Sequence, residues 1–205
     1  MAAVVPNPAH VMAFADASAF EQWVRKHHDT ADEIWLKIHK KESGLPTVTY
    51  AEALDVALCW GWIDGQKKSY DASSFLQRFC PRAAKSIWSQ RNIAHTERLT
   101  KAGRMTPQGQ AQVDAAKADG RWQRAYAAGR QMTIPDDLAA AIAANPKAQA
   151  TFETLNRQNQ FALAFRTHNM KTPAGRAKKI AGFVEMLARG ETIHPNGAGA
   201  RKAGK

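Results

Sequence analysis

The sequence predicts an α+β fold, in which a small antiparallel sheet is packed by helices and followed by an all-helical C-terminal subdomain. Residues 33–41 alternate apolar and polar side chains, which is the period of a half-buried strand. Residues 18–28 and 175–189 instead repeat apolar side chains every three or four positions, as one face of a helix does. Hydrophobic residues make up 44% of the chain, which is enough for a folded core.

The second helix of the first half has a clear start signal. A Ser-Gly-Leu-Pro turn follows the strand of residues 33–41. Thr49 and Glu52 then form a capping box, in which each side chain satisfies the free backbone N–H of the other residue. A helix is therefore expected from Thr49 to about Trp60.

Two further strands complete the predicted sheet. Residues 62–68 and 74–79 are short runs on either side of a turn, and both are expected to pair with the strand of residues 33–41. Pro81 should then leave the sheet, because proline has no N–H to donate to a central ladder.

The rest of the chain is predicted to be helical. Ser89 and Thr106 are suited to begin helices, and glycines follow the expected helix ends. Asn145-Pro146 interrupts one helical pattern and starts the next. Helices are expected over residues 89–102, 106–120, 134–145, 148–155, 159–168 and 175–189.

These elements divide the chain into four segments. Residues 1–13 are expected to be a flexible N-terminus, and residues 14–128 an α+β main domain. Residues 132–192 form the helical C-terminal subdomain. Residues 193–205 are rich in Gly, Ala and Lys, and we expect a disordered basic tail there.

Composition excludes several classes of protein. No run approaches the roughly 20 apolar residues of a membrane-spanning helix. The N-terminus lacks the pattern of a secretory signal, so we expect a cytoplasmic protein without a membrane span. Cys59 and Cys80 are too few for a disulfide framework and lack zinc-ligand spacing, so they are interpreted as buried thiols, although one disulfide between them stays open. No metal site and no cofactor are expected.

Positive charge is concentrated in two parts of the chain. The net charge is +11. Residues 66–104 carry nine Lys and Arg against two Asp and Glu, and residues 157–205 carry ten against two. Such a distribution attracts phosphate, nucleic acid or an anionic surface, and the alternative is a basic surface that only keeps the protein in solution.

The segment from Leu58 to Asn92 is the predicted functional site. It holds three of the six tryptophans together with acidic and basic side chains. Charges beside tryptophan are costly unless they are paired or hydrated, so this mixture favours the lining of a ligand site over a pure core. The predicted ligand-binding residues are Trp60, Trp62, Asp64, Lys67, Asp71, Arg78, Arg82, Ser86, Trp88 and Asn92.

Individual residues of this segment suggest a small anionic or aromatic ligand. The forked guanidinium of Arg82 suits a carboxylate or a phosphate, and Trp88 offers a flat ring for stacking. Asp64 has two interpretations, an ion pair that fixes the fold or a carboxylate beside a ligand.

Two blocks of sequence resemble a known family. The first comprises ALCWGWIDG, Phe79-Cys80-Pro81-Arg82 and Ser86-Ile87-Trp88-Ser89. The second comprises IPDDLAAAIAANPKAQATFETL and KTPAGRAKKIAGFVEMLARGE. The first block resembles the YdeI/OmpD-associated family, also labelled bacteriocin-protection proteins, and the second is similar to the C-terminal helical domain of that family. The resemblance implies a role in stress, bacteriocin or antimicrobial-peptide protection.

We therefore expect a non-catalytic binding protein with a cleft lined by Trp, Arg and Asp. The sequence contains none of the common hydrolase, phosphate-loop or dinucleotide motifs. Two alternatives stay open. One is a nucleic-acid-binding accessory protein that uses the basic C-terminal third, including Lys178 and Lys179. The other is an uncharacterised enzyme that uses Asp64 and Arg82.

Overall fold

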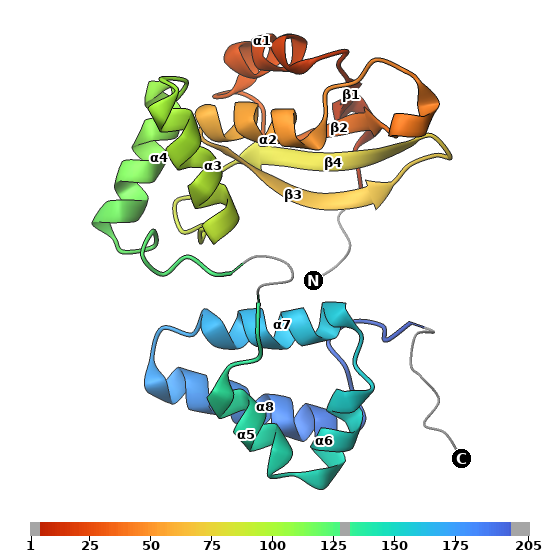
Figure 1. Cartoon of the computed structure of the whole chain (residues 1–205), viewed down its shortest axis with the longest axis vertical. Coiled ribbons are helices and arrows are strands. Elements are labelled where there is room, and N and C mark those ends of the chain that lie inside the picture. Colours follow the sequence, from red (N-terminus) through yellow and green to blue (C-terminus); the bar gives the residue numbers. More distant parts are fainter. Residues whose placement is uncertain (1–4, 128–131, 198–205) are drawn as a thin grey trace. The chain divides into compact units, whose positions relative to one another are not determined.

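A computed structural model describes residues 5–127 and 132–197 of the chain. The chain divides into two compact units, residues 1–125 (unit 1) and residues 126–205 (unit 2). Unit 1 contains a four-stranded sheet with helices, and the elements of unit 2 are helices (Figure 1). The predicted α+β class with a helical C-terminal part is confirmed.

Most elements of unit 1 lie where their start and stop signals predict them. Both hydrogen bonds of the capping box at Thr49 and Glu52 are present, and Ser89 and Thr106 cap the helices that follow them. In chain order the elements are η1 (Pro8–His10), β1 (Val11–Ala13), α1 (Ala17–His27), β2 (Ile34–His39), η2 (Lys41–Ser43), α2 (Tyr50–Cys59), β3 (Trp62–Ser69), β4 (Ser74–Pro81), α3 (Gln90–Lys101) and α4 (Pro107–Ala118).

The sheet differs from the prediction in two respects. Its strand order is β1-β2-β4-β3, so β3 pairs with β4 and not with β2. The strand β1 belongs to the segment that was expected to be flexible, and it pairs in parallel with residues 35–37 of β2. The sheet is therefore mixed rather than purely antiparallel.

The prediction that Pro81 leaves the sheet is wrong. Pro81 is the last residue of β4 and lies opposite Trp62 of β3. The pairing of β2 with β4 stops at Phe79, so beyond that residue β4 has a neighbouring strand on one side only. A proline is tolerated at this edge position because its missing N–H removes no bond to β2.

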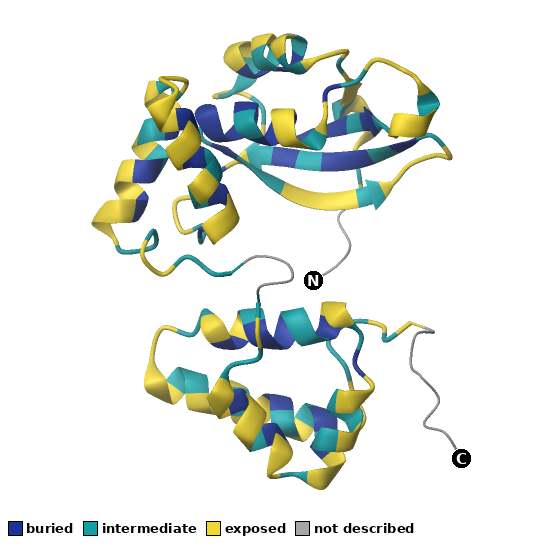
Figure 2. Ribbon diagram, in the orientation of Figure 1, coloured by how far each residue is buried: buried dark blue, intermediate teal, exposed yellow. Residues whose placement is uncertain are grey.

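Helices α1 and α2 cover one face of the sheet and build the core of unit 1 (Figure 1). In Figure 2 the dark blue, buried positions follow α2, β2 and β4, whereas the middle of the edge strand β3 is exposed. Fully buried side chains of this core include Phe20, Ile34, Leu36, Leu54, Phe79 and Leu99. This packing brings the first turns of α2 and α3 close to the start of β3, where the polar residues described below lie.

Unit 2 contains the helices α5 (Asp136–Ala143), α6 (Pro146–Glu153), α7 (Arg157–His168) and α8 (Pro173–Ala188). Its core is formed by apolar side chains of all four helices and the turn after α6, namely Leu138, Ile142, Ala148, Leu155, Leu163, Phe183 and Leu187. One outer side of α8 is left exposed (Figure 2).

The beginning of the expected disordered tail is ordered. The backbone N–H of His194 donates to Asn159, and the amide of Asn159 donates to the carbonyl of His194 at 3.1 Å. Asn196 accepts a hydrogen bond from the backbone of Asn156. Asn159 is 1% exposed, so its amide needs partners, and the tail supplies them. Residues 198–205 of the expected tail lie outside the described residues.

Candidate functional site

The structure separates the ten predicted site residues into four places in unit 1. Trp60 and Trp62 lie against the C-terminal end of α1. The indole N–H of Trp60 donates to Glu21, and that of Trp62 donates to the carbonyl of His28. Trp62 is 1% exposed, so it is a core side chain whose polar atom is satisfied within the fold.

The second place is the hairpin of β3 and β4. Lys67 lies over the ring of Phe75 at 3.9 Å, and Asp71 forms an ion pair with Lys37 at 3.2 Å. Hydrogen bonds, first of all from Ser74, hold the pKa of Asp71 below its usual range.

Arg78 of the same hairpin contacts the residue that precedes β2. It forms an ion pair with Glu33, which also accepts a hydrogen bond from Trp35. Burial alone raises the pKa of Glu33, but these hydrogen bonds outweigh it and hold the pKa below the ordinary value. The charges at the hairpin are therefore engaged with neighbouring strands.

The third place is a buried stack of Arg82 and Trp88. The guanidinium carbon of Arg82 lies 3.7 Å from the centre of the Trp88 ring, and Trp122 packs 4.9 Å from that ring. Arg82 is 5% exposed and Trp88 is 2% exposed. A ring that stacks on Trp88 would first have to displace one of these two neighbours. Ser86 lies nearby and contributes its carbonyl, which accepts a hydrogen bond from Arg121.

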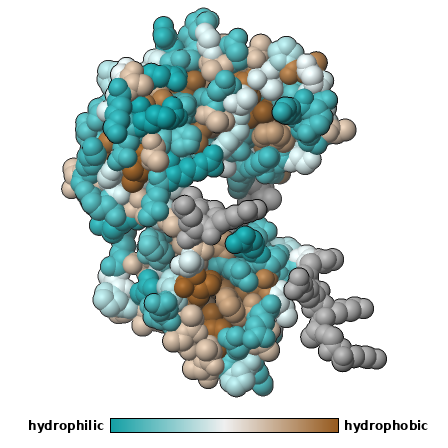
Figure 3. Space-filling model, viewed as in Figure 1, coloured by the Kyte–Doolittle hydropathy of each residue, from teal (hydrophilic) through white to brown (hydrophobic). Residues whose placement is uncertain are grey.

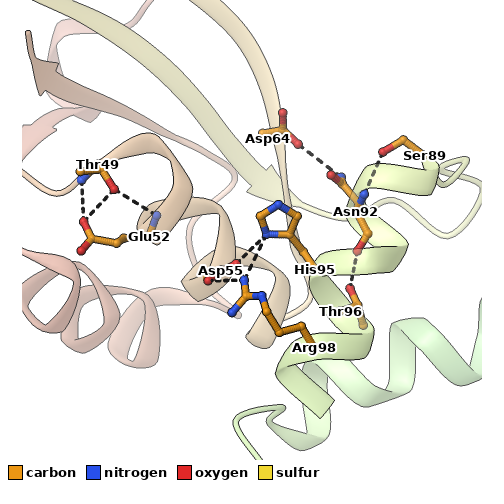
Figure 4. Close-up of polar contacts among 9 residues, drawn as sticks. All are labelled: Thr49, Glu52, Asp55, Asp64, Ser89, Asn92, His95, Thr96 and Arg98. Carbon is orange, nitrogen blue, oxygen red and sulfur yellow. Dashed lines mark hydrogen bonds and ion pairs between the residues drawn. The ribbon is translucent and has the colours of Figure 1, made fainter. Parts of the chain in front are cut away.

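The fourth place joins Asp64 and Asn92 at the ends of β3 and α3. The hydroxyl of Tyr50 donates to one carboxylate oxygen of Asp64 at 2.8 Å. The amide of Asn92 donates to the other oxygen at 3.4 Å, as Figure 4 shows. Asn92 lies in the first turn of α3, where Ser89 caps the helix. Asp64 thus has a donor on each oxygen, and it ties α2 and α3 to the sheet.

A second polar cluster lies one turn further along α3, and the sequence analysis missed it. Asp55 of α2 accepts a hydrogen bond from Nδ1 of His95 at 2.8 Å, and Nη2 of Arg98 donates to both of its oxygens at 2.6 Å. Figure 4 shows the side chains of His95 and Arg98 converging on Asp55 from α3. This pairing leaves the second ring nitrogen of His95 and most donors of Arg98 outside the ion pair.

The charge of Asp55 is stabilised by this arrangement. Its side chain is 14% exposed. Burial alone raises the pKa of Asp55, but the hydrogen bonds from Arg98 and His95 outweigh burial and hold the pKa below the ordinary value. The carboxylate therefore fixes the orientation of the imidazole, with the proton of the ring directed at Asp55.

Two arginines and a histidine form one face of α3. Arg91, His95 and Arg98 stand at positions i, i+4 and i+7, so they project from the same side of the helix. We call these three residues the α3 cationic face. Arg91 is exposed and lies 5.1 Å over the ring of Tyr50, and Arg98 has a side chain that is 55% exposed. At a rise of 1.5 Å per residue the two arginines are roughly 10 Å apart along the helix.

The exposed donors of the α3 cationic face have the chemistry that suits an anion. The nearby carboxylates of Asp55 and Asp64 are already engaged by donors within the fold, whereas Arg91 and Arg98 keep donors toward solvent. Guanidinium groups with such exposed donors suit carboxylate and phosphate. Within residues 5–127 and 132–197, no group of three or more His, Cys, Asp or Glu is placed to hold a metal ion.

The residues of the predicted enzyme alternative make separate contacts. Asp64 bonds Tyr50 and Asn92, whereas Arg82 stacks on Trp88 and donates to the carbonyl of Ile87. Both cysteines are free thiols. Burial raises the pKa of Cys59 to about 11 and also raises the pKa of Cys80. Both thiols are therefore protonated at neutral pH and are poor nucleophiles.

Two family models match the chain. Residues 131–190 match a model described as "Bacteriocin-protection, YdeI or OmpD-Associated", and residues 12–112 match one described as "Domain of unknown function (DUF8412)". The expected resemblance is thus confirmed in the second block, and the first block falls within a different model. No curated protein and no solved structure matches the chain. None of the described helices is long and apolar enough to cross a membrane.

Proposed function

We propose that this protein, which carries a domain of the bacteriocin-protection, YdeI or OmpD-associated family in residues 131–190, is a non-catalytic binding protein that takes up a small anionic ligand on the α3 cationic face of unit 1. A role in protection against stress, bacteriocins or antimicrobial peptides is the role that this family description supports. This binding site differs from the expected Trp, Arg and Asp cleft, because none of its three residues is among the ten residues predicted from the sequence.

One observation carries this proposal. Arg91 and Arg98 are exposed on the same face of α3, and Asp64 is engaged by Tyr50 and Asn92. Asp55 is engaged by His95 and by Nη2 of Arg98, so Nε and Nη1 of Arg98 lie outside that ion pair. Arg91 makes its contact with the ring of Tyr50 and forms no ion pair among the described residues. An anion that binds there gains charge-assisted hydrogen bonds without first breaking a buried ion pair.

The position of His95 supports an extended anion. Its imidazole lies between the two arginines in the sequence of α3 and is held by Asp55. A ligand with two anionic groups can reach both guanidinium groups, which are roughly 10 Å apart along the helix axis. The side chain of His95 is 23% exposed, so it can donate or accept a hydrogen bond at the middle of such a ligand.

Ligand-induced thermal stabilisation tests the proposal. The probes are inorganic phosphate, pyrophosphate, adipate, AMP and ATP, because they vary the number and spacing of anionic groups. A compound that binds the native state raises the melting temperature. We expect at least one probe to do so, and we expect Arg91→Ala to weaken its binding about tenfold, the effect of losing one charge-assisted hydrogen bond.

The matched control is Lys26→Ala. Lys26 is an exposed cation on α1, so its substitution changes the net charge by the same amount while leaving α3 intact. Binding to the Lys26→Ala protein should equal binding to the wild type. The proposal is wrong if no probe stabilises the wild type, or if the two variants lose affinity equally.

A second candidate function is nucleic-acid binding through the basic C-terminal third. Lys178 and Lys179 are both exposed on α8. Affinity for a duplex oligonucleotide would then fall steeply with salt, because each neutralised phosphate releases counterions. Charge reversal at both lysines would weaken this binding, and Arg91→Ala would leave it unchanged.

A further inference from the structure

Unit 2 has an apolar groove on its surface between α5 and α8. The groove encloses about 760 Å³. Figure 3 shows apolar side chains gathered over this part of unit 2. The groove is lined mainly by small and aliphatic side chains, namely Ala141 of α5, Ala144 at the C-cap of α5, and Ala177, Ile180, Ala181 and Val184 of α8. Exposed apolar surface of this kind is typical of a docking surface for another helix.

Charged residues lie at both ends of the groove, and only those at one end form an ion pair with each other. At one end Asp137 and Arg176 form an ion pair with contacts of 2.6 and 2.7 Å, so they neutralise each other. At the other end lies Glu185, which forms no salt bridge among the described residues. Lys178 stands seven residues before it, is exposed and likewise forms no salt bridge there. These two opposite charges lie about 10 Å apart along α8.

A glycine in the middle of α8 has no explanation within unit 2. A Cβ atom placed on Gly182 would meet no described atom within 4 Å. Glycine inside a helix is destabilising relative to alanine, because it loses more backbone entropy on folding. A glycine at position 182 leaves room for another polypeptide to approach the backbone of α8 closely. Gly182 and Ala181 are both exposed, and the midpoint between Lys178 and Glu185 falls between them.

We propose that the groove between α5 and α8 binds α8 of a second copy of this chain, so that the protein forms a twofold-symmetric dimer with the two α8 helices antiparallel. Lys178 of each copy then faces Glu185 of the other, which gives two equivalent salt bridges. Ala181 and Gly182 lie at the crossing point, where small side chains let the two helices approach closely.

The positions of Lys178 and Glu185 favour a second copy of α8 as the partner, and they favour the antiparallel arrangement. In a twofold interface the same surface serves both copies, so a surface is suited to it when it is complementary to itself. Lys178 and Glu185 meet that requirement only in the antiparallel arrangement, because parallel helices would place like charges opposite each other. The inference does not depend on the anion site of unit 1.

Sedimentation equilibrium on the full chain tests the dimer. We expect the wild type to be a dimer in equilibrium with the monomer. Lys178→Glu and Glu185→Lys each turn both salt bridges into like-charge contacts, so each should raise the dissociation constant by roughly tenfold or more. An equimolar mixture of these two variants should form a mixed dimer of near wild-type affinity, because both contacts again join opposite charges.

One further variant is a control for this experiment, and another tests the crossing point. Lys171→Glu reverses an exposed charge of unit 2 outside α8 and should leave the dissociation constant unchanged. Gly182→Leu should weaken the dimer by blocking the crossing point, while circular dichroism shows that the helices remain folded. A wild type that stays monomeric at every concentration overturns the proposal, as does a mixture of the two charge-reversed variants that remains as dissociated as either variant alone.

Discussion

Two arginine–aromatic pairs of unit 1, Arg82 with Trp88 and Arg91 with Tyr50, have opposite surroundings, although the two arginines are close together in the sequence. Arg82 and Trp88 stack at 3.7 Å and are almost completely buried. Arg91 lies 5.1 Å over Tyr50 and is exposed. An arginine over an aromatic ring therefore contributes to the core in one case and presents a charge to solvent in the other. Burial therefore separates the arginine that packs in the core from the arginine that we propose as a ligand contact.

The largest expected effect concerns the buried pair. Trp88→Ala removes a ring that packs against both Arg82 and Trp122, and it leaves the guanidinium without its aromatic cover. We expect the free energy of unfolding to fall by about 3–5 kcal/mol, as for other large-to-small core substitutions. Urea denaturation measures this loss. A loss below about 1 kcal/mol would mean that the ring is not part of the core.

A smaller effect is expected where α3 is tied to α2. Asp55→Ala removes the acceptor of His95 and Arg98, and we expect it to destabilise the protein at pH 7 by about 1–3 kcal/mol. Because the folded-state pKa of Asp55 is lowered, its contribution is complete above the unfolded value of 3.8 and is lost as the pH falls through the folded value.

Unfolding measured over a range of pH checks this assignment. The difference between wild type and Asp55→Ala should be constant near neutral pH and should shrink in acid below pH 3.8. A difference that is the same at neutral pH and at about pH 2 would show that the charge of Asp55 contributes nothing to stability.

The smallest effect on stability is expected at the exposed pair. Arg91→Ala should change the free energy of unfolding by less than about 0.5 kcal/mol, because Arg91 is exposed and forms no ion pair among the described residues. Its effect should be seen in anion binding instead. A loss of stability comparable to that of Trp88→Ala would remove the distinction between the two pairs.

Local signals predicted the helices well because each signal acts over a few residues. The capping box at Thr49 and the caps at Ser89 and Thr106 fixed three helix starts correctly. The strand β1 was missed because it has three residues and is stabilised by parallel pairing with β2, more than 20 positions away in the chain. The pairing of Pro81 was misjudged for a similar reason, since strand order is a tertiary property.

The three residues of the α3 cationic face were not among the residues predicted from the sequence. Of the predicted residues, Asp64 and Asn92 are in contact, whereas Arg82 and Trp88 are buried. Asp55 and His95 were missed because they are 40 residues apart and meet only through the packing of two helices. The spacing of Arg91, His95 and Arg98 at i, i+4 and i+7 was the signal in the sequence that could have revealed the exposed face.

The most direct test of the account is an NMR titration with pyrophosphate that follows the imidazole signals of all histidines. Binding at the α3 cationic face should shift the signal of His95 in a saturable way and leave that of His39 on β2 unchanged. The Arg91→Ala protein should need about tenfold more pyrophosphate for the same shift. A His95 signal that stays in place, or that moves no more than the signal of His39, would contradict the account.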